Sequence, residues 1–288
     1  SMNFPNRLMT GPFLSEQDKA DLLFGAENDV DFIACSFVSR KEDLLSVREF
    51  LAAHGASDID LIAKIENRSG VDNLEDICTA CDGVMVMAPS FPHRHYDMAR
   101  PALEMGKPVY VDKIFAPSEE EGGRIFQLAA RHGAPLFSSS ALRFDASLDA
   151  FRGKEDQNIR WCLTCGPNIF RIYAIHQIEM LETVMGRARR VKALGNEGGR
   201  TLIFDFGGGR MGQMTQMDRL PFQLSVSDGK TNVYQAVGED FFLRLVRAIL
   251  AFFTDKKPPV APANTLNALA MLAAAQKAMA RQDEWIDV

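Results

Sequence analysis

The sequence lacks three features that would decide its class at once: an excess of basic charge, a long apolar run and a secretion signal. Its 32 lysines and arginines are outnumbered by 38 aspartates and glutamates, so no basic footprint for nucleic acid is present. No apolar run approaches the length of a membrane span, and the N-terminus lacks the charged-then-apolar pattern of a signal peptide. We therefore expect a cytoplasmic protein without nucleic-acid or membrane partners, which opens with a cloning remnant, Ser1-Met2.

Cysteine is also scarce, with five residues, and the odd number favours a reducing compartment. Four of the cysteines form two CxxC pairs, Cys78/Cys81 and Cys162/Cys165, a spacing that zinc sites use. Residues 161–165 have the pattern of a strand, however, and residues three apart on a strand face opposite sides. Buried free thiols are the favoured interpretation, and a four-thiolate zinc site is the alternative.

Hydrophobic residues are plentiful, at 47%, and 288 residues suit two compact domains. Up to about residue 144, short apolar runs suited to buried parallel strands alternate with helical spacing. Right-handed crossovers between such strands predict a parallel sheet whose strands follow one another in chain order. The expected fold class is α/β, with a Rossmann-like sheet over residues 1–144 and strands at 31–38, 60–66, 83–88, 108–112 and 135–139.

The rhythm changes after residue 145. A helical region around His176 spans residues 170–185, and two long helices close the chain at 239–253 and 264–281. Runs of strands flanked by helices predict a C-terminal α+β domain, residues 145–288, built on an antiparallel sheet. Its hairpin-like strands are expected at 201–206, 213–217, 222–227 and 231–235.

One stretch fits the dinucleotide fingerprint GxGxxG letter by letter: Gly207, Gly209 and Gly212. The fingerprint binds a pyrophosphate only where a strand turns into a helix. Residues 213–217 continue with strand spacing, so these glycines are predicted to form a hairpin turn. Ahead of the first strands no fingerprint is present, which removes the usual cradle for a pyrophosphate.

Four stretches, 13–25, 30–38, 62–67 and 81–86, resemble the pyruvate kinase barrel, and the resemblance extends over residues 3–87. It implies that Lys64 steadies transferring phosphoryl charge and that Glu66 ligates Mg²⁺. Such a site needs a second acidic ligand, which the family carries in an Ala-Arg-Gly-Asp run. Residues 87–90 read Met-Ala-Pro-Ser here, so we expect no metal and interpret Glu66 as a remnant. A metal reading of His93, His95 and Asp97 is also disfavoured, because their spacing is not that of helical ligands.

A second resemblance rests on residues 87–93, 102–113, 143–144 and 166–180. From residue 82 onward the chain resembles the Gfo/Idh/MocA oxidoreductase family. This implies that Ala88, Pro89 and His93 border the nicotinamide of a cofactor. It also implies that Lys113 and His176 are the ancestral catalytic pair for proton transfer coupled to hydride transfer.

The catalytic region departs from that family's pattern at two positions. Ile114 replaces the usual proline after the lysine, and Ile172 replaces the aspartate often found four residues before the histidine. Without the resemblance, His176 in its apolar surroundings would be interpreted as a core histidine. We therefore leave open whether Lys113 and His176 function.

The two resemblances meet on one strand, residues 81–88, where both families have a similar sequence. A splice inside a shared strand exchanges a βα unit in register, and the rhythm continues across it. We predict a recombinant or engineered chimeric scaffold without native turnover, for which no cofactor or only weak NAD(P) binding is expected. The alternatives are an NAD(P)-dependent oxidoreductase and, less favoured, a pyruvate kinase-like phosphoryl transferase. The open sheet of such C-terminal domains also predicts a homo-oligomer.

Overall fold

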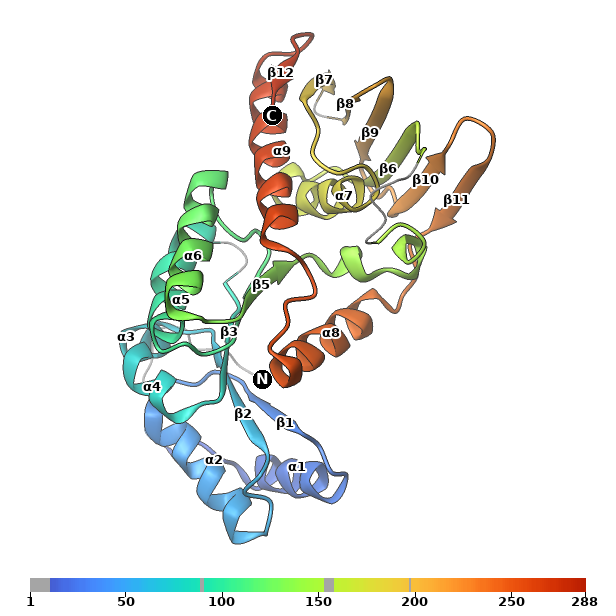
Figure 1. Cartoon of the computed structure of the whole chain (residues 1–288). Coiled ribbons are helices and arrows are strands. Elements are labelled where there is room, and N and C mark those ends of the chain that lie inside the picture. The colour runs from blue at the N-terminus through green and yellow to red at the C-terminus, as the bar shows by residue number, and fades with distance from the viewer. Residues whose placement is uncertain (1–10, 89–90, 153–157, 197) are drawn as a thin grey trace. The chain divides into compact units, whose positions relative to one another are not determined.

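The computed structural model describes residues 11–88, 91–152, 158–196 and 198–288 (Figure 1). It divides into two compact units that interleave along the chain. The first unit comprises residues up to 112, 124–137 and 250–258, and the second comprises 113–123, 138–249 and 259–288. In the described ranges, no helix combines the length and the apolar character needed to cross a membrane. The division at residue 144 expected from the sequence stays a prediction.

Five parallel strands form the first sheet, which confirms the predicted α/β class. Their order across the sheet is β1-β2-β3-β4-β5, the chain order expected from handed βαβ units. A dinucleotide-binding sheet of the classic type instead places its first strand centrally, and the reversal of strand order there creates the ligand crevice. Among the strands that the structure describes, this sheet has no such reversal. The strands are β1 (Phe32–Cys35), β2 (Asp60–Ile65), β3 (Gly83–Val86), β4 (Val109–Asp112) and β5 (Leu136–Ser139).

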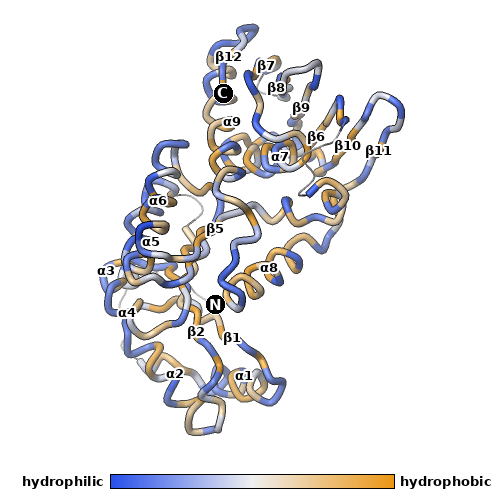
Figure 2. The backbone as a smooth tube through the Cα atoms, in the orientation of Figure 1, coloured by the Kyte–Doolittle hydropathy of each residue, from blue (hydrophilic) through white to orange (hydrophobic). Residues whose placement is uncertain are grey.

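Helices alternate with these strands, and their ends follow local capping chemistry. The first helix begins at a capping box, in which the Asp18 amide donates to Ser15 Oγ and the Ser15 amide donates to Asp18 Oδ2. Helices α5 and α6 carry both hydrophilic and hydrophobic residues along their length (Figure 2). The helices are α1 (Glu16–Glu27), α2 (Lys41–Ala53), α3 (Arg68–Asp72), α4 (Leu74–Ala80), α5 (His95–Glu104) and α6 (Glu119–His132).

The last turns of helix α8 (Phe241–Asp255) pack on the first sheet. The Phe253 ring lies 6.4 Å from the Phe32 ring, and the Phe252 ring lies 4.8 Å from the Phe137 ring. Gly83 makes room for this contact, since a Cβ there would meet a Phe253 ring carbon at 2.4 Å. A residue more than 160 positions away in the chain therefore requires glycine at the start of β3.

The second sheet has seven strands in the order β11-β10-β6-β9-β8-β7-β12. Strands β6 and β9 are parallel, and the other pairings are antiparallel, so the sheet is mixed and not the antiparallel one expected. The reason is that helix α7 and the β7–β8 hairpin intervene before β9 returns in the direction of β6. The strands are β6 (Trp161–Pro167), β7 (Arg190–Asn196), β8 (Gly199–Gly207), β9 (Arg210–Met217), β10 (Gln223–Ser227), β11 (Asn232–Ala236) and β12 (Ile286–Asp287).

The glycine-rich stretch is a hairpin turn, as predicted. Gly207 pairs with Arg210, so residues 208 and 209 form a two-residue loop between β8 and β9. Gly207, Gly208 and Gly209 have φ values of 76°, 60° and 77°, the left-handed region that glycine adopts without strain. No helix follows this turn, so the fingerprint cannot bind a pyrophosphate.

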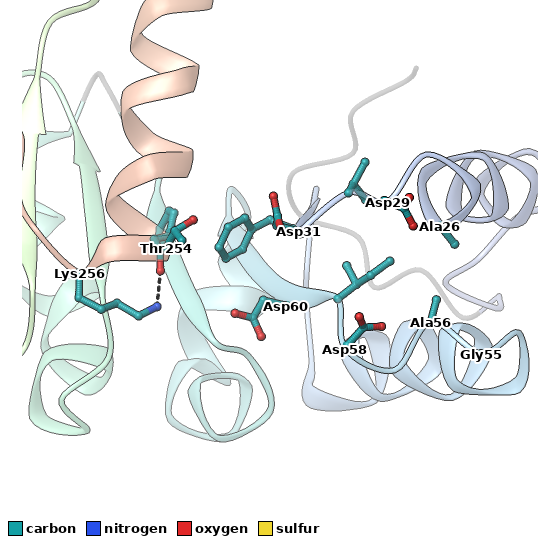
Figure 3. Close-up of a pocket in the computed structure, with 13 residues that line it drawn as sticks. Ala26, Asp29, Asp31, Gly55, Ala56, Asp58, Asp60, Thr254 and Lys256 are labelled. Atoms are coloured by element: carbon teal, nitrogen blue, oxygen red, sulfur yellow. Dashed lines mark hydrogen bonds between the residues drawn. The ribbon is translucent and has the colours of Figure 1, made fainter.

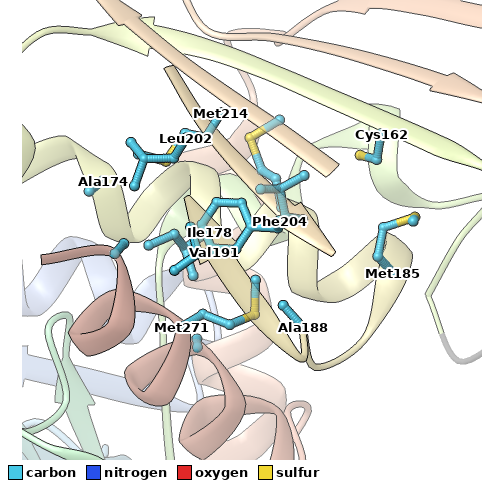
Figure 4. Packing of buried hydrophobic residues seen from close by; sticks show 14 of the residues in the cluster. Cys162, Ala174, Ile178, Met185, Ala188, Val191, Leu202, Phe204, Met214 and Met271 are labelled. Carbon is cyan, nitrogen blue, oxygen red and sulfur yellow. The ribbon is translucent and has the colours of Figure 1, made fainter. Parts of the chain in front are cut away.

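One face of the second sheet carries the core of the second unit (Figure 4). Helices α7 (Phe170–Met185) and α9 (Pro262–Ala280) cover this face. Leu202 and Phe204 of β8 are fully buried there, together with Ile178 of α7 and Met271 of α9. The intervening residues of the strands, such as Ile203, point to the other face and stay partly exposed.

The five cysteines are all free thiols. Cys78 and Cys81 are buried at the end of α4, whereas Cys162 and Cys165 lie on β6, where one is buried and the other half-buried. The opposite orientation of the second pair is the one expected for residues three apart on a strand. Across the described ranges, no cluster of three or more candidate metal ligands occurs.

Candidate functional site

Lys113 and His176 lie at the same site, although 63 positions separate them. Lys113 directly follows β4, and His176 lies in the middle of α7; both are half-buried and belong to the second unit. Burial lowers the pKa of His176, and the charge of Lys113 lowers it further, so the two groups interact electrostatically. The peptide bond between Lys113 and Ile114 is cis. The two residues predicted as the catalytic pair are therefore neighbours.

The imidazole of His176 is held by a hydroxyl group and two aromatic rings. Its Nδ1 lies 2.5 Å from Ser140 Oγ. The ring centroids of Phe222 and Tyr173 lie 5.8 Å and 6.2 Å from that of His176. Burial, and secondarily the Lys113 charge, lower the pKa of His176 to about 4. His176 is therefore a neutral imidazole at neutral pH.

Ser140, which the sequence analysis did not identify, is itself fixed by a carboxylate. The residue is fully buried, and its amide donates to Glu179 Oε2 at 2.9 Å. The same carboxylate oxygen accepts from the Ser139 hydroxyl at 3.1 Å and from Arg143 Nε at 2.9 Å. Glu179 lies on α7 three positions after His176, so one helix carries both the imidazole and the anchor of its hydroxyl partner.

A buried ionic cluster supports this arrangement. Arg143 Nη1 donates to Glu182 Oε2 at 2.8 Å and to Thr183 Oγ1 at 2.9 Å, and Asn264 donates to the other Glu182 oxygen at 2.7 Å. Burial opposes the charge of Arg143, but the carboxylates of Glu179 and Glu182 outweigh it and raise the pKa of the guanidinium. The i, i+3 pair of acids on an apolar helix was the sequence signal that could have revealed this cluster.

Ala88 and His93, predicted to border a nicotinamide, belong to the first unit. The Ala88 carbonyl accepts hydrogen bonds from the Phe91 amide and from His95 Nε2, both at 3.0 Å. His93 is exposed in a short turn of 3₁₀ helix, with its ring 6.0 Å from that of Phe91. Pro89 lies outside the described residues. His95 is fully buried at the start of α5, which fits a structural role.

Lys64 and Glu66, the residues of the pyruvate kinase resemblance, make contacts with their own neighbours at the carboxyl end of β2. Lys64 Nζ lies 3.2 Å from Glu66 Oε1 and donates to Ser36 Oγ at 2.9 Å. The other Glu66 oxygen accepts from the Phe37 amide at 3.0 Å. Both charged side chains are therefore paired with each other and with groups in the turn that follows β1.

Several backbone amides at the carboxyl ends of β1 and β2 are already paired with side chains. After β1, Asp43 Oδ2 accepts from the Ser39 amide at 2.9 Å and from the Arg40 amide at 3.1 Å, and Glu66 takes the Phe37 amide. After β2, the Asn67 side chain accepts the Gly70 amide at 2.7 Å. A phosphate group after β1 would meet the carboxylates of Asp43 and Glu66, and this negative charge disfavours a dinucleotide pyrophosphate there.

The first unit also has a cavity of about 580 Å³ at the opposite end of the strands, where β1 and β2 begin (Figure 3). Asp29 and Asp31 line it just before β1, and Asp58 and Asp60 line it just before and at the start of β2. None of the predicted site residues borders this cavity. Four carboxylates around one opening disfavour an anionic cofactor.

The family model of the pyruvate kinase barrel domain matches residues 1–89. Pyruvate kinase of Clostridium perfringens is 49% identical over 85 residues, which cover 30% of this chain and 18% of that protein. The enzyme of Geobacillus stearothermophilus is likewise 49% identical over 85 residues, 30% of this chain and 14% of that protein. The chain thus spans less than a fifth of the length of these curated relatives.

Solved structures match nearly the whole chain instead. A probable dehydrogenase from Thermotoga maritima has a TM-score of 0.66 at 16% identity and covers 92% of this chain and 95% of its own. The WlbA dehydrogenase from Bordetella pertussis, in complex with NADH and UDP-GlcNAcA, has a TM-score of 0.60 at 17% identity, with 89% and 98% covered. An oxidoreductase from Agrobacterium radiobacter, in complex with NAD⁺, L-tartaric acid and magnesium, has a TM-score of 0.59 at 12% identity, with 93% and 94% covered.

One of these similarities is in sequence and covers the start of the chain; the other is in fold and covers nearly all of it. At such low identity the solved structures show the fold alone, which this chain shares with these dehydrogenases and oxidoreductases. The sequence of the first 89 residues is nevertheless similar to that of a pyruvate kinase barrel. The chain therefore combines a barrel-like sequence at its start with an oxidoreductase fold, as a two-part chimera would.

Proposed function

We propose that the chain is a recombined scaffold, in which a barrel fragment replaces the nucleotide-binding start of an oxidoreductase, and that it has no efficient catalytic turnover. The observation that carries this proposal is the pairing of the amides after β1 with the carboxylates of Asp43 and Glu66. The unbroken strand order supports it, because ligands of open α/β sheets bind where the order reverses.

The energetic consequence is a large loss of cofactor affinity. Charge-assisted hydrogen bonds to a pyrophosphate contribute about 1.5–3 kcal/mol each. Losing two or three of them turns a micromolar site into a millimolar one, since each 1.4 kcal/mol is tenfold in affinity. NAD(P) would then bind weakly, through its nicotinamide end.

A second candidate function is NAD(P)-dependent oxidation or reduction of a polyhydroxylated small molecule. It is favoured by the proximity of Lys113 and His176, and by neighbours crystallised with NADH and UDP-GlcNAcA or with NAD⁺ and L-tartaric acid. In that case the ammonium group of Lys113 and the imidazole of His176 would contact the oxygen of the substrate. The cofactor would supply the hydride.

Phosphoryl transfer finds no comparable support. Lys64 and Glu66 pair with each other and with the turn after β1, which leaves neither charge open toward a ligand. The position expected for the second acidic ligand reads Met87-Ala88, followed by Pro89-Ser90 outside the described residues. This reaction class is therefore the least favoured of the three.

A thermal-shift titration against NAD⁺, NADH, NADP⁺ and NADPH separates the first two candidates. A ligand that binds the native state raises the melting temperature with its concentration. We expect no shift at ~0.1 mM for any of the four. A shift that grows with concentration in this range, together with hydride transfer that disappears in Lys113→Ala, would establish the oxidoreductase instead.

We also propose that the chain forms a homodimer through the open face of the second sheet. The strand register places Ser225, Leu163, Gln213 and Ile203 in one row across β10, β6, β9 and β8 on this face. Leu163 and Ile203 are partly exposed there, and Trp161 is half-exposed one row away. These partly exposed apolar residues on an otherwise polar face are suited to contact a second copy of the sheet.

A further inference from the structure

The hydroxyl group of Ser140 has one evident hydrogen-bond acceptor. Ser140 is fully buried, and its Oγ already accepts a hydrogen bond from the Leu142 amide at 3.2 Å. A buried hydroxyl must also place its own hydrogen on an acceptor. Within the described part of the chain, His176 Nδ1 lies at hydrogen-bond distance from this hydroxyl, at 2.5 Å, and can accept its hydrogen.

We infer that Ser140 donates its hydroxyl proton to His176 Nδ1 and thereby fixes His176 as the neutral Nε2–H tautomer. In a neutral imidazole, one nitrogen carries the proton and the other has the lone pair. With the lone pair of Nδ1 engaged by Ser140, the proton resides on Nε2. His176 then offers a ligand a hydrogen-bond donor, and Ser140 is the residue that determines this role.

The surroundings keep Ser140 and the imidazole in this relation. The amide of Ser140 donates to Glu179, which also accepts from Arg143. These bonds fix the backbone of Ser140, and with it the position from which the side chain extends. Tyr173 and Phe222 pack beside the imidazole and restrict its rotation. Ser140 is therefore a positioning residue: it is too deeply buried to contact a ligand and acts through His176.

The tautomer narrows the chemistry of the ligand. Lys113 and the Nε2–H group of His176 are both donors, so the site suits an oxygen acceptor such as a carbonyl, hydroxyl or carboxylate oxygen. The titratable groups near the imidazole are Lys113 and Tyr173, and the Glu179 carboxylate reaches it only through the backbone of Ser140. Proton transfer to a bound oxygen would then fall to Lys113, while His176 orients that oxygen.

The inference deepens the site of the second candidate function, but it does not depend on cofactor binding. It is tested by long-range ¹H–¹⁵N correlation spectra of the ¹⁵N-labelled full chain, with the His176 signals assigned by their loss in His176→Gln. Between pH 6 and 8 we expect the Nε2–H tautomer in the wild-type protein. Ser140→Ala should mix the tautomers and raise the pKa of His176 by about one unit, a tenfold change in proton affinity.

Two matched variants separate positioning from general disturbance. Ser140→Thr keeps the hydroxyl and should restore the wild-type tautomer. Ser139→Ala removes the neighbouring hydroxyl, which binds Glu179, and should leave the tautomer unchanged. A wild-type spectrum of the Nδ1–H tautomer would overturn the inference even if Ser140→Ala did not fold, as would an unchanged tautomer in a folded Ser140→Ala. Neither result bears on NAD(P) affinity, which the thermal-shift titration measures separately.

Discussion

The turns at the carboxyl ends of β1 and β2 and the site around His176 are both rich in polar groups, but they use them differently. In the turns, Lys64 pairs with Glu66, and Glu66 and Asp43 take the backbone amides beside them. At the other site, buried acids pair with Arg143 beneath the surface, while Lys113 has no ion pair within the described ranges. The charges of the first region are paired within the protein, whereas the second region has Lys113 and His176 as possible donors to a ligand.

This contrast fits the proposal that a barrel fragment kept the fold but not the nucleotide site. A βα unit carries its strand adjacency and its capping contacts with it, so it fits into a parallel sheet without help from its neighbours. A dinucleotide site, in contrast, needs open amides at one turn and a reversal of strand order. Over its described residues, the first unit has the sheet without a reversal of strand order, and carboxylates accept from amides after β1.

The largest effect on the unfolding free energy should come from the buried acids beside His176. Glu182→Gln removes a carboxylate that binds Arg143 at 2.8 Å with both side chains almost fully buried. Breaking a buried pair leaves an uncompensated charge and should cost about 3–5 kcal/mol of unfolding free energy. The matched change in the first region, Glu66→Gln, should cost roughly 1 kcal/mol, because Glu66 and Lys64 are partly exposed. Chemical denaturation compares the two; equal costs would contradict the distinction between them.

A smaller effect tests the packing of α8 on the first sheet. Gly83→Ala places a methyl group against the Phe253 ring and should destabilise the protein by about 1–3 kcal/mol. Gly123→Ala, in helix α6, meets no atom within 4 Å and should stabilise it by up to ~1 kcal/mol. Thermal denaturation measures both. Adding Phe253→Leu to Gly83→Ala should recover part of the loss, and no recovery would mean that this contact does not set the requirement for glycine.

The pH dependence of stability should carry the signature of His176. Its pKa is about 4 in the folded chain and about 6.5 when unfolded, so between these values the unfolded state binds the extra proton. The unfolding free energy should therefore fall by about 1–3 kcal/mol as the pH decreases from 6.5 to 4. His176→Gln should remove this part of the slope. Urea denaturation at several pH values tests this, and identical slopes for both proteins would count against a neutral His176.

The smallest effect on folding should come from the open face of the second sheet. Leu163→Asp should leave the unfolding transition nearly unchanged and convert the proposed dimer into a monomer, because the side chain lies outside the core. Ser225→Asp, its neighbour in the same row but nearer the sheet edge, should weaken the dimer less. Light scattering measures the mass, and a wild-type value of about 32.0 kDa at tens of micromolar would refute the dimer.

Much of the fold could be predicted from the sequence because burial on both faces gives the parallel strands continuous apolar runs. Leu61, Ile62 and Ala63 of β2 are all buried, and the chain order of the strands follows from the handedness of βαβ units. The parallel pairing of β6 with β9 was missed, since it depends on how the chain returns after α7 and two further strands. No pattern along one segment contains that information.

The candidate site was predictable in part for a similar reason. Lys113 and His176 were identified because each stands in a stretch that resembles a known family. Ser140 and Glu179 were not, because their roles come from contacts across 36 and 39 positions that no spacing rule encodes. The same holds for Asp43. Only its bonds to the Ser39 and Arg40 amides show that its carboxylate occupies groups that could otherwise bind a phosphate.

The most direct test of the central claim is isothermal titration calorimetry of the full chain with NAD⁺, NADH, NADP⁺ and NADPH. Because the amides after β1 are paired with carboxylates, and no reversal of strand order creates a crevice, we predict dissociation constants of ~1 mM or weaker for all four. A dissociation constant below ~50 μM for any of them would contradict the loss of the nucleotide site.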